Sequence, residues 1–163
     1  MGKRSNFERI ERDCYDTPAA QAKALLPHLA PGTRFVEPCA GSGKLSGFLV
    51  ENGMQCMAQY DIAPRTDGVV ERDVFRNPIC MGDMFITNPP WNKKRGAPDW
   101  DIANRIAVHL SDIAPTWLLM PADWWCRKYA APLRDRVVRL VPAGRAKWIP
   151  DSKFNAKDDC AWY

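Results

Sequence analysis

The chain has 163 residues, a length that suits one domain with a hydrophobic core and is too short for two ordinary ones. Hydrophobic residues make up 46% and charged residues 26%, as in globular proteins, and no apolar run approaches the roughly eighteen residues needed to span a bilayer. The net charge of +4 is uneven, because residues 1–91 carry 10 basic and 11 acidic side chains and residues 92–163 carry 13 and 8. The basic second half favours a polyanionic partner, although a solvated basic surface would give the same count.

Cysteines and histidines give no sign of a disulfide framework or a metal site. The six cysteines are scattered without a C-x-x-C pair, a pattern typical of reduced thiols in a cytosolic protein. The two histidines, His28 and His109, have no partner at the spacing of metal ligands. We therefore expect a cytoplasmic protein that holds no metal and crosses no membrane.

Predicted helices and strands alternate along the chain. The first helix is expected over 19–29, with Asp16 or Thr17 as its cap and Pro18 in its first turn. The other predicted helices cover 44–52, a segment that begins at 98, and 123–135, and the predicted strands cover 34–36, 55–60, 84–87, 116–120 and 137–141. This alternation predicts a single α/β domain over residues 1–163 with a doubly wound, mostly parallel sheet.

Two glycines follow the first predicted strand, in the segment Glu37-Pro38-Cys39-Ala40-Gly41-Ser42-Gly43. Glycines at this place let the backbone pass close to a ligand where the next helix begins. The dinucleotide-binding pattern G-x-G-x-x-G requires a third glycine at 46, where this chain has Ser46. The phosphate-binding loop G-x-x-x-x-G-K-[ST] fails as well, because Pro38 and Leu45 stand at two of its fixed positions.

A second loop follows the predicted strand 84–87, about fifty residues later, and consists of Asn88-Pro89-Pro90-Trp91. These two loops resemble the signature loops of S-adenosylmethionine-dependent amino-methyltransferases. The first has an acid, three residues and then G-x-G, and the second is Asn-Pro-Pro followed by an aromatic residue. The order resembles in particular the N6-adenine DNA methyltransferases that lack a recognition domain between the loops. The resemblance implies a Rossmann-like methyltransferase sheet. Residues 158–163 would be the first half of its last strand, either because the sequence is truncated or because the protein ends early.

The resemblance also assigns residues to the methyl donor. Glu37 would face the methionine ammonium, Asp61 would accept hydrogen bonds from both ribose hydroxyls, and Asp73 would accept one from the adenine amine. A segment before the first helix resembles the N-terminal motif that folds over the donor, with a plain helix cap as the alternative interpretation; its residues are Tyr15, Thr17 and Pro18. The remaining residues assigned to the donor are Cys39, Ala40, Gly41, Gly43, Ile62 and Val74.

The acceptor loop is suited to a nitrogen that is hard to methylate. An exocyclic amine on a purine is a poor nucleophile, because its lone pair is delocalised into the ring. By the resemblance, the Asn88 side-chain oxygen and the Pro89 carbonyl accept hydrogen bonds from the amine and direct its lone pair at the donor methyl. Pro89 and Pro90 keep the loop stiff, and Trp91 offers a face on which a base can stack.

Lys93, Lys94 and Arg95 follow this loop and are expected to contact phosphates around an extruded nucleotide. The expected activity is therefore methyl transfer from S-adenosylmethionine to N6 of adenine in DNA, in the cytoplasm of a bacterial cell or of a host infected by phage. RNA adenine and a protein glutamine remain alternative acceptors, because Asn-Pro-Pro-aromatic loops serve all these nitrogens. A non-catalytic, nucleic-acid-binding partner of an active methyltransferase is a further alternative, against which the intact donor and acceptor loops argue.

Overall fold

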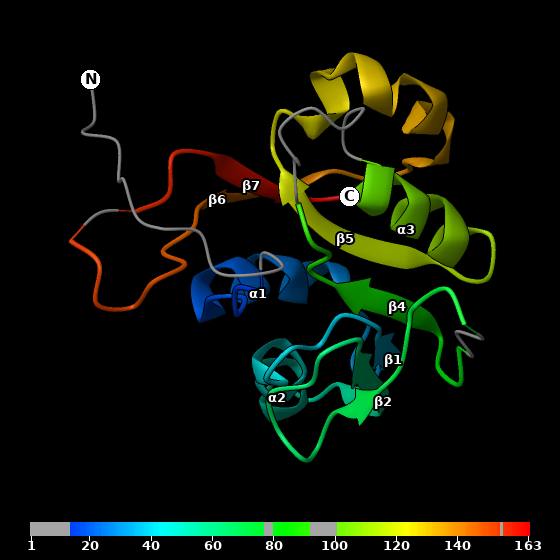
Figure 1. The fold of residues 1–163 in the computed structure, drawn as a ribbon, viewed down its shortest axis with the longest axis vertical. Helices are drawn as coiled ribbons and strands as arrows, with labels where there is room; N and C mark the ends of the chain where they lie inside the picture. The colour runs from blue at the N-terminus through cyan, green and yellow to red at the C-terminus, as the bar shows by residue number, and fades with distance from the viewer. Residues whose placement is uncertain (1–13, 77–79, 92–100, 154) are drawn as a thin grey trace.

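The computed structural model describes residues 14–76, 80–91, 101–153 and 155–163 (Figure 1). Within these residues, seven strands form one sheet in the order β3-β2-β1-β4-β5-β7-β6. The strands are β1 Arg34–Glu37, β2 Gln55–Asp61, β3 Val70–Glu71, β4 Met84–Thr87, β5 Thr116–Pro121, β6 Val141–Arg145 and β7 Asp159–Trp162. Strands β1 to β5 pair in parallel, and β7 is antiparallel to both β5 and β6. The predicted doubly wound, mostly parallel α/β sheet is confirmed.

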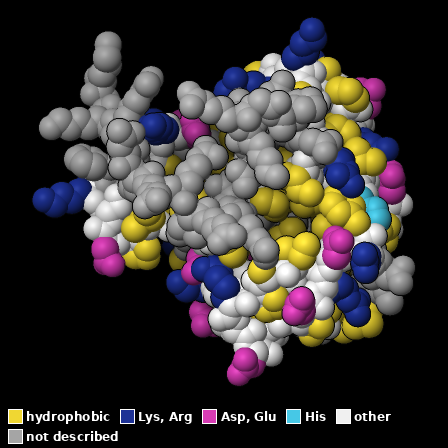
Figure 2. All heavy atoms as spheres, in the orientation of Figure 1, with side chains coloured by type: hydrophobic (Ala, Val, Ile, Leu, Met, Phe, Trp, Pro, Cys, Tyr) yellow, Lys and Arg dark blue, Asp and Glu magenta, His cyan; other side chains and the backbone are white. Residues whose placement is uncertain are grey.

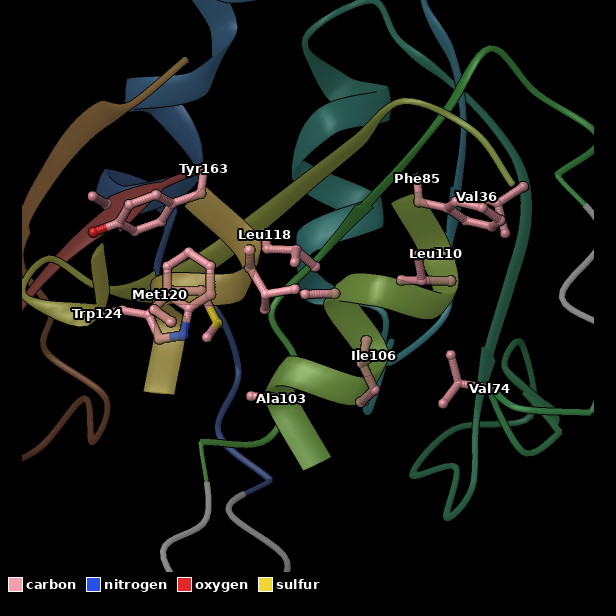
Figure 3. Close-up of a cluster of buried hydrophobic side chains, with 14 of the residues drawn as sticks. Val36, Val74, Phe85, Ala103, Ile106, Leu110, Leu118, Met120, Trp124 and Tyr163 are labelled. Carbon is pink, nitrogen blue, oxygen red and sulfur yellow. The ribbon is translucent and has the colours of Figure 1, made fainter. Parts of the chain in front are cut away.

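Helices cover both faces of the sheet, because successive strand residues point to opposite sides. They are α1 Ala19–Leu25, α2 Lys44–Glu51 and α3 Asp101–Ser111, with the 3₁₀ helices η2 Leu26–His28, η3 Trp124–Cys126 and η4 Lys128–Arg136. Phe35 and Ile86 pack with α1 and α2. Their neighbours Val36 and Phe85 belong to the cluster that includes α3 and η4, and Figure 3 shows them with Ile106 and Leu110 of α3. In the described part of the chain, no helix has the length and apolar character that crossing a membrane requires.

Two predicted helices differ from those observed. Helix α1 begins at Ala19, and Asp16 and Thr17 do not cap it, since the backbone carbonyl of Pro18 accepts the first hydrogen bonds. The helix predicted over 123–135 is instead the pair of 3₁₀ helices η3 and η4. Pro132 lies inside η4, where it lacks the amide hydrogen that an α-helix requires.

The strand predicted over 137–141 was placed too early. Strand β6 begins at Val141, which is buried opposite Trp162 of β7, whereas Val138 is 96% exposed. The last strand was expected to be incomplete. Strand β7 is short, but it pairs along both edges, and Leu118 and Tyr163 continue its ladder with β5 through two backbone hydrogen bonds.

Candidate active site at the carboxyl edge of the sheet

Three of the predicted site residues lie where neighbouring strands end. Glu37 ends β1, Asp61 ends β2, and Asn88 follows β4, and these strands are adjacent in the order β2-β1-β4. Strands β2 and β3 lie on one side of β1, and β4 and β5 lie on the other. Between β1 and β4 the connections therefore leave in opposite directions, and such a switch point opens a crevice beyond the strand ends. The two loops that the sequence singled out therefore meet at one edge of the sheet.

The glycine loop bends sharply between β1 and α2. Gly41 and Gly43 adopt φ angles of +55° and +75°, which residues other than glycine rarely adopt. A Cβ atom at Gly41 would lie 2.8 Å from the Arg65 guanidinium, and one at Gly43 would lie 3.0 Å from the Gln59 side-chain oxygen. The backbone conformation therefore requires glycine at both positions, and the ends of the Arg65 and Gln59 side chains pack against the loop.

Glu37 lies beneath this loop and is only 2% exposed. Its Oε2 atom accepts hydrogen bonds from the backbone amide of Ser46, at 3.0 Å, and from the Ser46 hydroxyl. Burial raises the pKa of Glu37 to about 8, although the Ser46 hydrogen bonds oppose the shift, and the charges of Asp61 and Asp16 add to it. Glu37 is therefore largely neutral at pH 7 and joins the end of β1 to the first turn of α2.

Asp61 is buried, and both of its carboxylate oxygens are held by the backbone. Oδ2 accepts from the Gly41 amide at 2.9 Å, and Oδ1 accepts from the Ala63 amide at 2.8 Å. A carboxylate can accept about four hydrogen bonds, so each oxygen retains capacity for one hydroxyl. Ile62 follows Asp61 with 60% of its surface exposed, at the place where the sequence predicts contact with the donor.

Asp73 lies after β3, and its Oδ1 atom accepts from the Phe75 amide at 2.9 Å. Val74, also predicted to contact the donor, is 8% exposed and packs in the core under α3. Arg105 lies over the Phe75 ring at 4.7 Å, and His109 packs against the same ring with centroids 5.3 Å apart. Helix α3 thereby fixes the turn that carries Asp73.

The acceptor loop is attached to the core and to the N-terminal segment. Asn88 donates through Nδ2 to the backbone carbonyl of Tyr15 at 3.4 Å, which leaves its side-chain oxygen for another partner. Trp91 donates through Nε1 to the Leu119 carbonyl at 2.9 Å. Trp148, after β6, packs edge-on against Trp91 with centroids 5.2 Å apart and lies 6.1 Å from the Tyr15 ring. The rings of Tyr15, Trp148 and Trp91 therefore pack one against the next, and the first and last belong to the segments that the Asn88 hydrogen bond joins.

Comparison with known proteins relates this arrangement to one fold. No protein-family model matches the chain, and no curated protein sequence is detectably similar to it. A candidate RNA methyltransferase from Pyrococcus horikoshii has a similar structure, with a TM-score of 0.66 and 15% identity over 99% of this chain and 91% of that one. The chain has the methyltransferase fold.

Two further structures with the methyltransferase fold are similar. The E. cuniculi Mtq2–Trm112 complex, described as responsible for methylating the eRF1 translation termination factor, matches with a TM-score of 0.59 and 13% identity over 91% of this chain and 96% of that one. A TehB-like SAM-dependent methyltransferase from Corynebacterium glutamicum matches with a TM-score of 0.50 and 13% identity over 88% of this chain and 86% of that one.

Two residues at this edge of the sheet were not predicted from the sequence to belong to the site. Asp16 was interpreted as a helix cap, yet its carboxylate contacts Ser42, Lys44 and Arg65. No local pattern marks Arg65, a single arginine in the loop after β2. The proximity of these residues depends on the tertiary fold.

The predicted phosphate-binding residues Lys93, Lys94 and Arg95 lie outside the described residues. On the face drawn in Figure 2, the Lys and Arg side chains of the described residues are interspersed with Asp and Glu. Across the described residues, no group of three or more His, Cys, Asp or Glu side chains is arranged to hold a metal ion.

Proposed function

We propose that the protein transfers a methyl group from S-adenosylmethionine to the exocyclic N6 amine of adenine in DNA. One observation carries the proposal. The backbone-anchored Asp61, the Gly41–Gly43 loop and Asn88 lie at the ends of three adjacent parallel strands. This combination of a diol acceptor, a glycine loop and an amide oxygen matches what the reaction requires of its site. The methyltransferase fold supports the part of the proposal that concerns methyl transfer from S-adenosylmethionine.

On the donor side, each group has a distinct task. The free lone pairs of Asp61 hold the ribose hydroxyls, the loop at Gly41 and Gly43 lets the backbone approach the donor, and Asp73 accepts from the adenine amine. Glu37 faces the amino-acid end of the donor from below, where an ammonium group would favour its ionised form. S-adenosylmethionine, when bound, supplies an electrophilic methyl group.

On the acceptor side, Asn88 is the central residue. Its side-chain nitrogen donates a hydrogen bond to the Tyr15 carbonyl, so its side-chain oxygen is the atom that accepts a hydrogen bond from the target amine. The Pro89 carbonyl accepts the second, and together they direct the nitrogen lone pair at the methyl group. Trp91, fixed by its bond to Leu119, provides a rigid aromatic surface for a planar base. The nitrogen loses its proton after transfer, when it has become acidic.

RNA adenine and a protein glutamine form a second candidate acceptor class. The structural similarity to a candidate RNA methyltransferase and to a complex that methylates a termination factor favours keeping these acceptors under test. All three nitrogens are conjugated and planar, so the Asn88 and Pro89 acceptors serve them equally. A non-catalytic nucleic-acid-binding subunit would lack any need for this geometry.

The test is transfer of labelled methyl from S-adenosylmethionine to single-stranded DNA, duplex DNA, RNA and protein, followed by analysis of the product. We expect N6-methyladenine from DNA. Asn88→Ala should reduce turnover by ~100-fold, or ~2.7 kcal/mol, with donor binding nearly unchanged. Asn52→Ala is the matched control, since Asn52 is an exposed asparagine whose amide bonds to Phe48 at the end of α2. If the product is N4-methylcytosine, methylated RNA or methylglutamine, the proposed acceptor is wrong. An Asn88→Ala variant as active as the parent would refute the assignment of this loop as the catalytic site.

A further inference from the structure

The segment before α1 lies against the glycine loop, where Asp16 contacts three other groups of the protein. Tyr15 of the same segment contacts Asn88 and Trp148. Asp16 accepts from the Ser42 hydroxyl at 2.6 Å, contacts the Lys44 ammonium at 2.9 Å, and pairs with Arg65. Ser42 belongs to the glycine loop, Lys44 begins α2, and Arg65 lies in the loop after β2. Asp16 thus connects the segment 14–18 to both sides of the proposed donor site.

The state of Asp16 agrees with this contact. Burial alone would raise the pKa of Asp16, but hydrogen bonds from Ser42 and Lys44 and the positive charges of Arg65 and Lys44 hold it below its ordinary value. The carboxylate is therefore ionised in its folded position at neutral pH. It makes no capping hydrogen bond to α1.

The two ends of this segment are held very differently. On one side, α1 is fixed to the sheet, because Gln21 donates to the Ala143 carbonyl at 3.1 Å and accepts at its own carbonyl from the buried Trp162 indole at 2.8 Å. On the other side, the Asp16 partners are exposed, with 62% of the Lys44 side chain and 39% of the Arg65 side chain accessible. Ion pairs of this exposure are weak and screened by salt. The Asp16 contacts can therefore break while α1 and the sheet stay folded.

The same segment also contacts the acceptor loop, through the bond from Asn88 to the Tyr15 carbonyl. We propose that Asp16 is a latch that holds residues 14–18 closed across the glycine loop, so that its release controls exchange of the donor and its product. This inference rests on the proposed function, because it takes the ligand under the latch to be S-adenosylmethionine. Closure also sets the amide orientation of Asn88, so donor enclosure and acceptor geometry are coupled.

A latch has a kinetic signature that a plain binding contact lacks. Asp16 makes its contacts with protein groups in the absence of a ligand, so weakening them favours the open state whether or not the donor is bound. A change that affects both states alike alters the rates of exchange more than the affinity, since only differential interaction shifts a binding equilibrium. Removing the charge of Asp16 should therefore accelerate both association and release.

The experiment measures association and dissociation of S-adenosylmethionine by stopped-flow tryptophan fluorescence, with affinity from calorimetry. In Asp16→Asn, both rates should rise about tenfold while the dissociation constant changes by less than about threefold. Rising salt should accelerate exchange in the parent and not in this variant. Asp16→Glu, which keeps the charge, should restore slow, salt-sensitive exchange.

Two further variants keep the test sharp. Lys44→Gln combined with Arg65→Gln should reproduce the fast exchange from the opposite side of the latch. Asp83→Asn is the matched control, because it removes an exposed pair with Arg34 of 2.7 Å at the other edge of the sheet, and its exchange should equal that of the parent. Unchanged rates in Asp16→Asn, or weaker affinity with an unchanged association rate, would overturn the latch. A parent protein that binds no donor would instead overturn the proposed function.

Discussion

Replacing Glu37 by glutamine tests the buried carboxyl beneath the glycine loop. Burial raises its pKa to about 8 from an ordinary value of 4.5, so the folded protein keeps a proton that the unfolded chain releases between these values. The stabilisation from the neutral form is complete below pH 4.5 and is lost as pH rises through 8. Linkage over pH 5 to 7 gives a loss of about 2–3 kcal/mol from this one group, and glutamine has no proton to lose. The free energy of unfolding of Glu37→Gln, relative to that of the parent, should therefore rise by about 2–3 kcal/mol from pH 5 to pH 7.

Urea unfolding at pH 5, 6 and 7 measures this difference directly. The pH dependence that comes from the other titrating groups is the same in both proteins and cancels in the comparison. Glu51→Gln is the matched control, since Glu51 is an exposed residue at the end of α2 and its replacement should leave the pH dependence as in the parent. If the parent and Glu37→Gln show parallel pH profiles, the carboxyl is ionised in the folded protein and the reasoning is wrong. If the donor ammonium faces Glu37, donor binding at pH 7 also releases a proton in the parent and not in Glu37→Gln, which calorimetry in buffers of different ionisation enthalpy detects.

Three other outcomes are expected. Asp61→Ala should weaken S-adenosylmethionine binding by about 1.5–3 kcal/mol in calorimetry, and unchanged affinity in the folded variant would exclude Asp61 from the site. Neutralising Lys93, Lys94 and Arg95 together should flatten the dependence of log DNA affinity on log salt, by somewhat less than one unit for each phosphate that these residues neutralise in the parent, whereas an unchanged slope would mean that they face solvent. Trp91→Phe should lower the free energy of unfolding by about 1 kcal/mol through removal of the bond to the Leu119 carbonyl, while methyl transfer persists; loss of transfer would show that the indole itself is needed.

The sheet was predictable because the pattern of apolar residues is set by burial on two faces. The segment Met84–Thr87 is a strand with the predicted bounds, and Phe85 and Ile86 enter different cores. The glycine loop follows β1 and Asp61 ends β2, as predicted, and the two meet because the carboxyl ends of neighbouring parallel strands lie at one edge of the sheet. Their assignment to donor binding stays a prediction.

What the sequence could not show depends on distant partners. The apolar run 137–141 predicts a strand locally, but pairing with β7 selects Val141–Arg145 instead. Asp16 precedes a helix and has the residue type of a cap, yet the cations that bind it come from other elements. Trp148 likewise lies in a loop with no local motif, and only the path of β6 brings it to Trp91.

The position of β7 has a consequence for the order in which the molecule folds. Among the described strands, β6 pairs only with β7, and β7 joins it to β5. The parallel strands β1 to β5 lie within residues 34–121 and can assemble from that part of the chain, whereas β6 stays unpaired until residues 159–162 insert beside β5. Pairing of Leu119 with Trp162 closes a loop about as long as the one closed by Phe35 and Met84 in the β1–β4 pair. The contact of Trp148 with Trp91 should consequently require that residues 159–162 have already paired with β5.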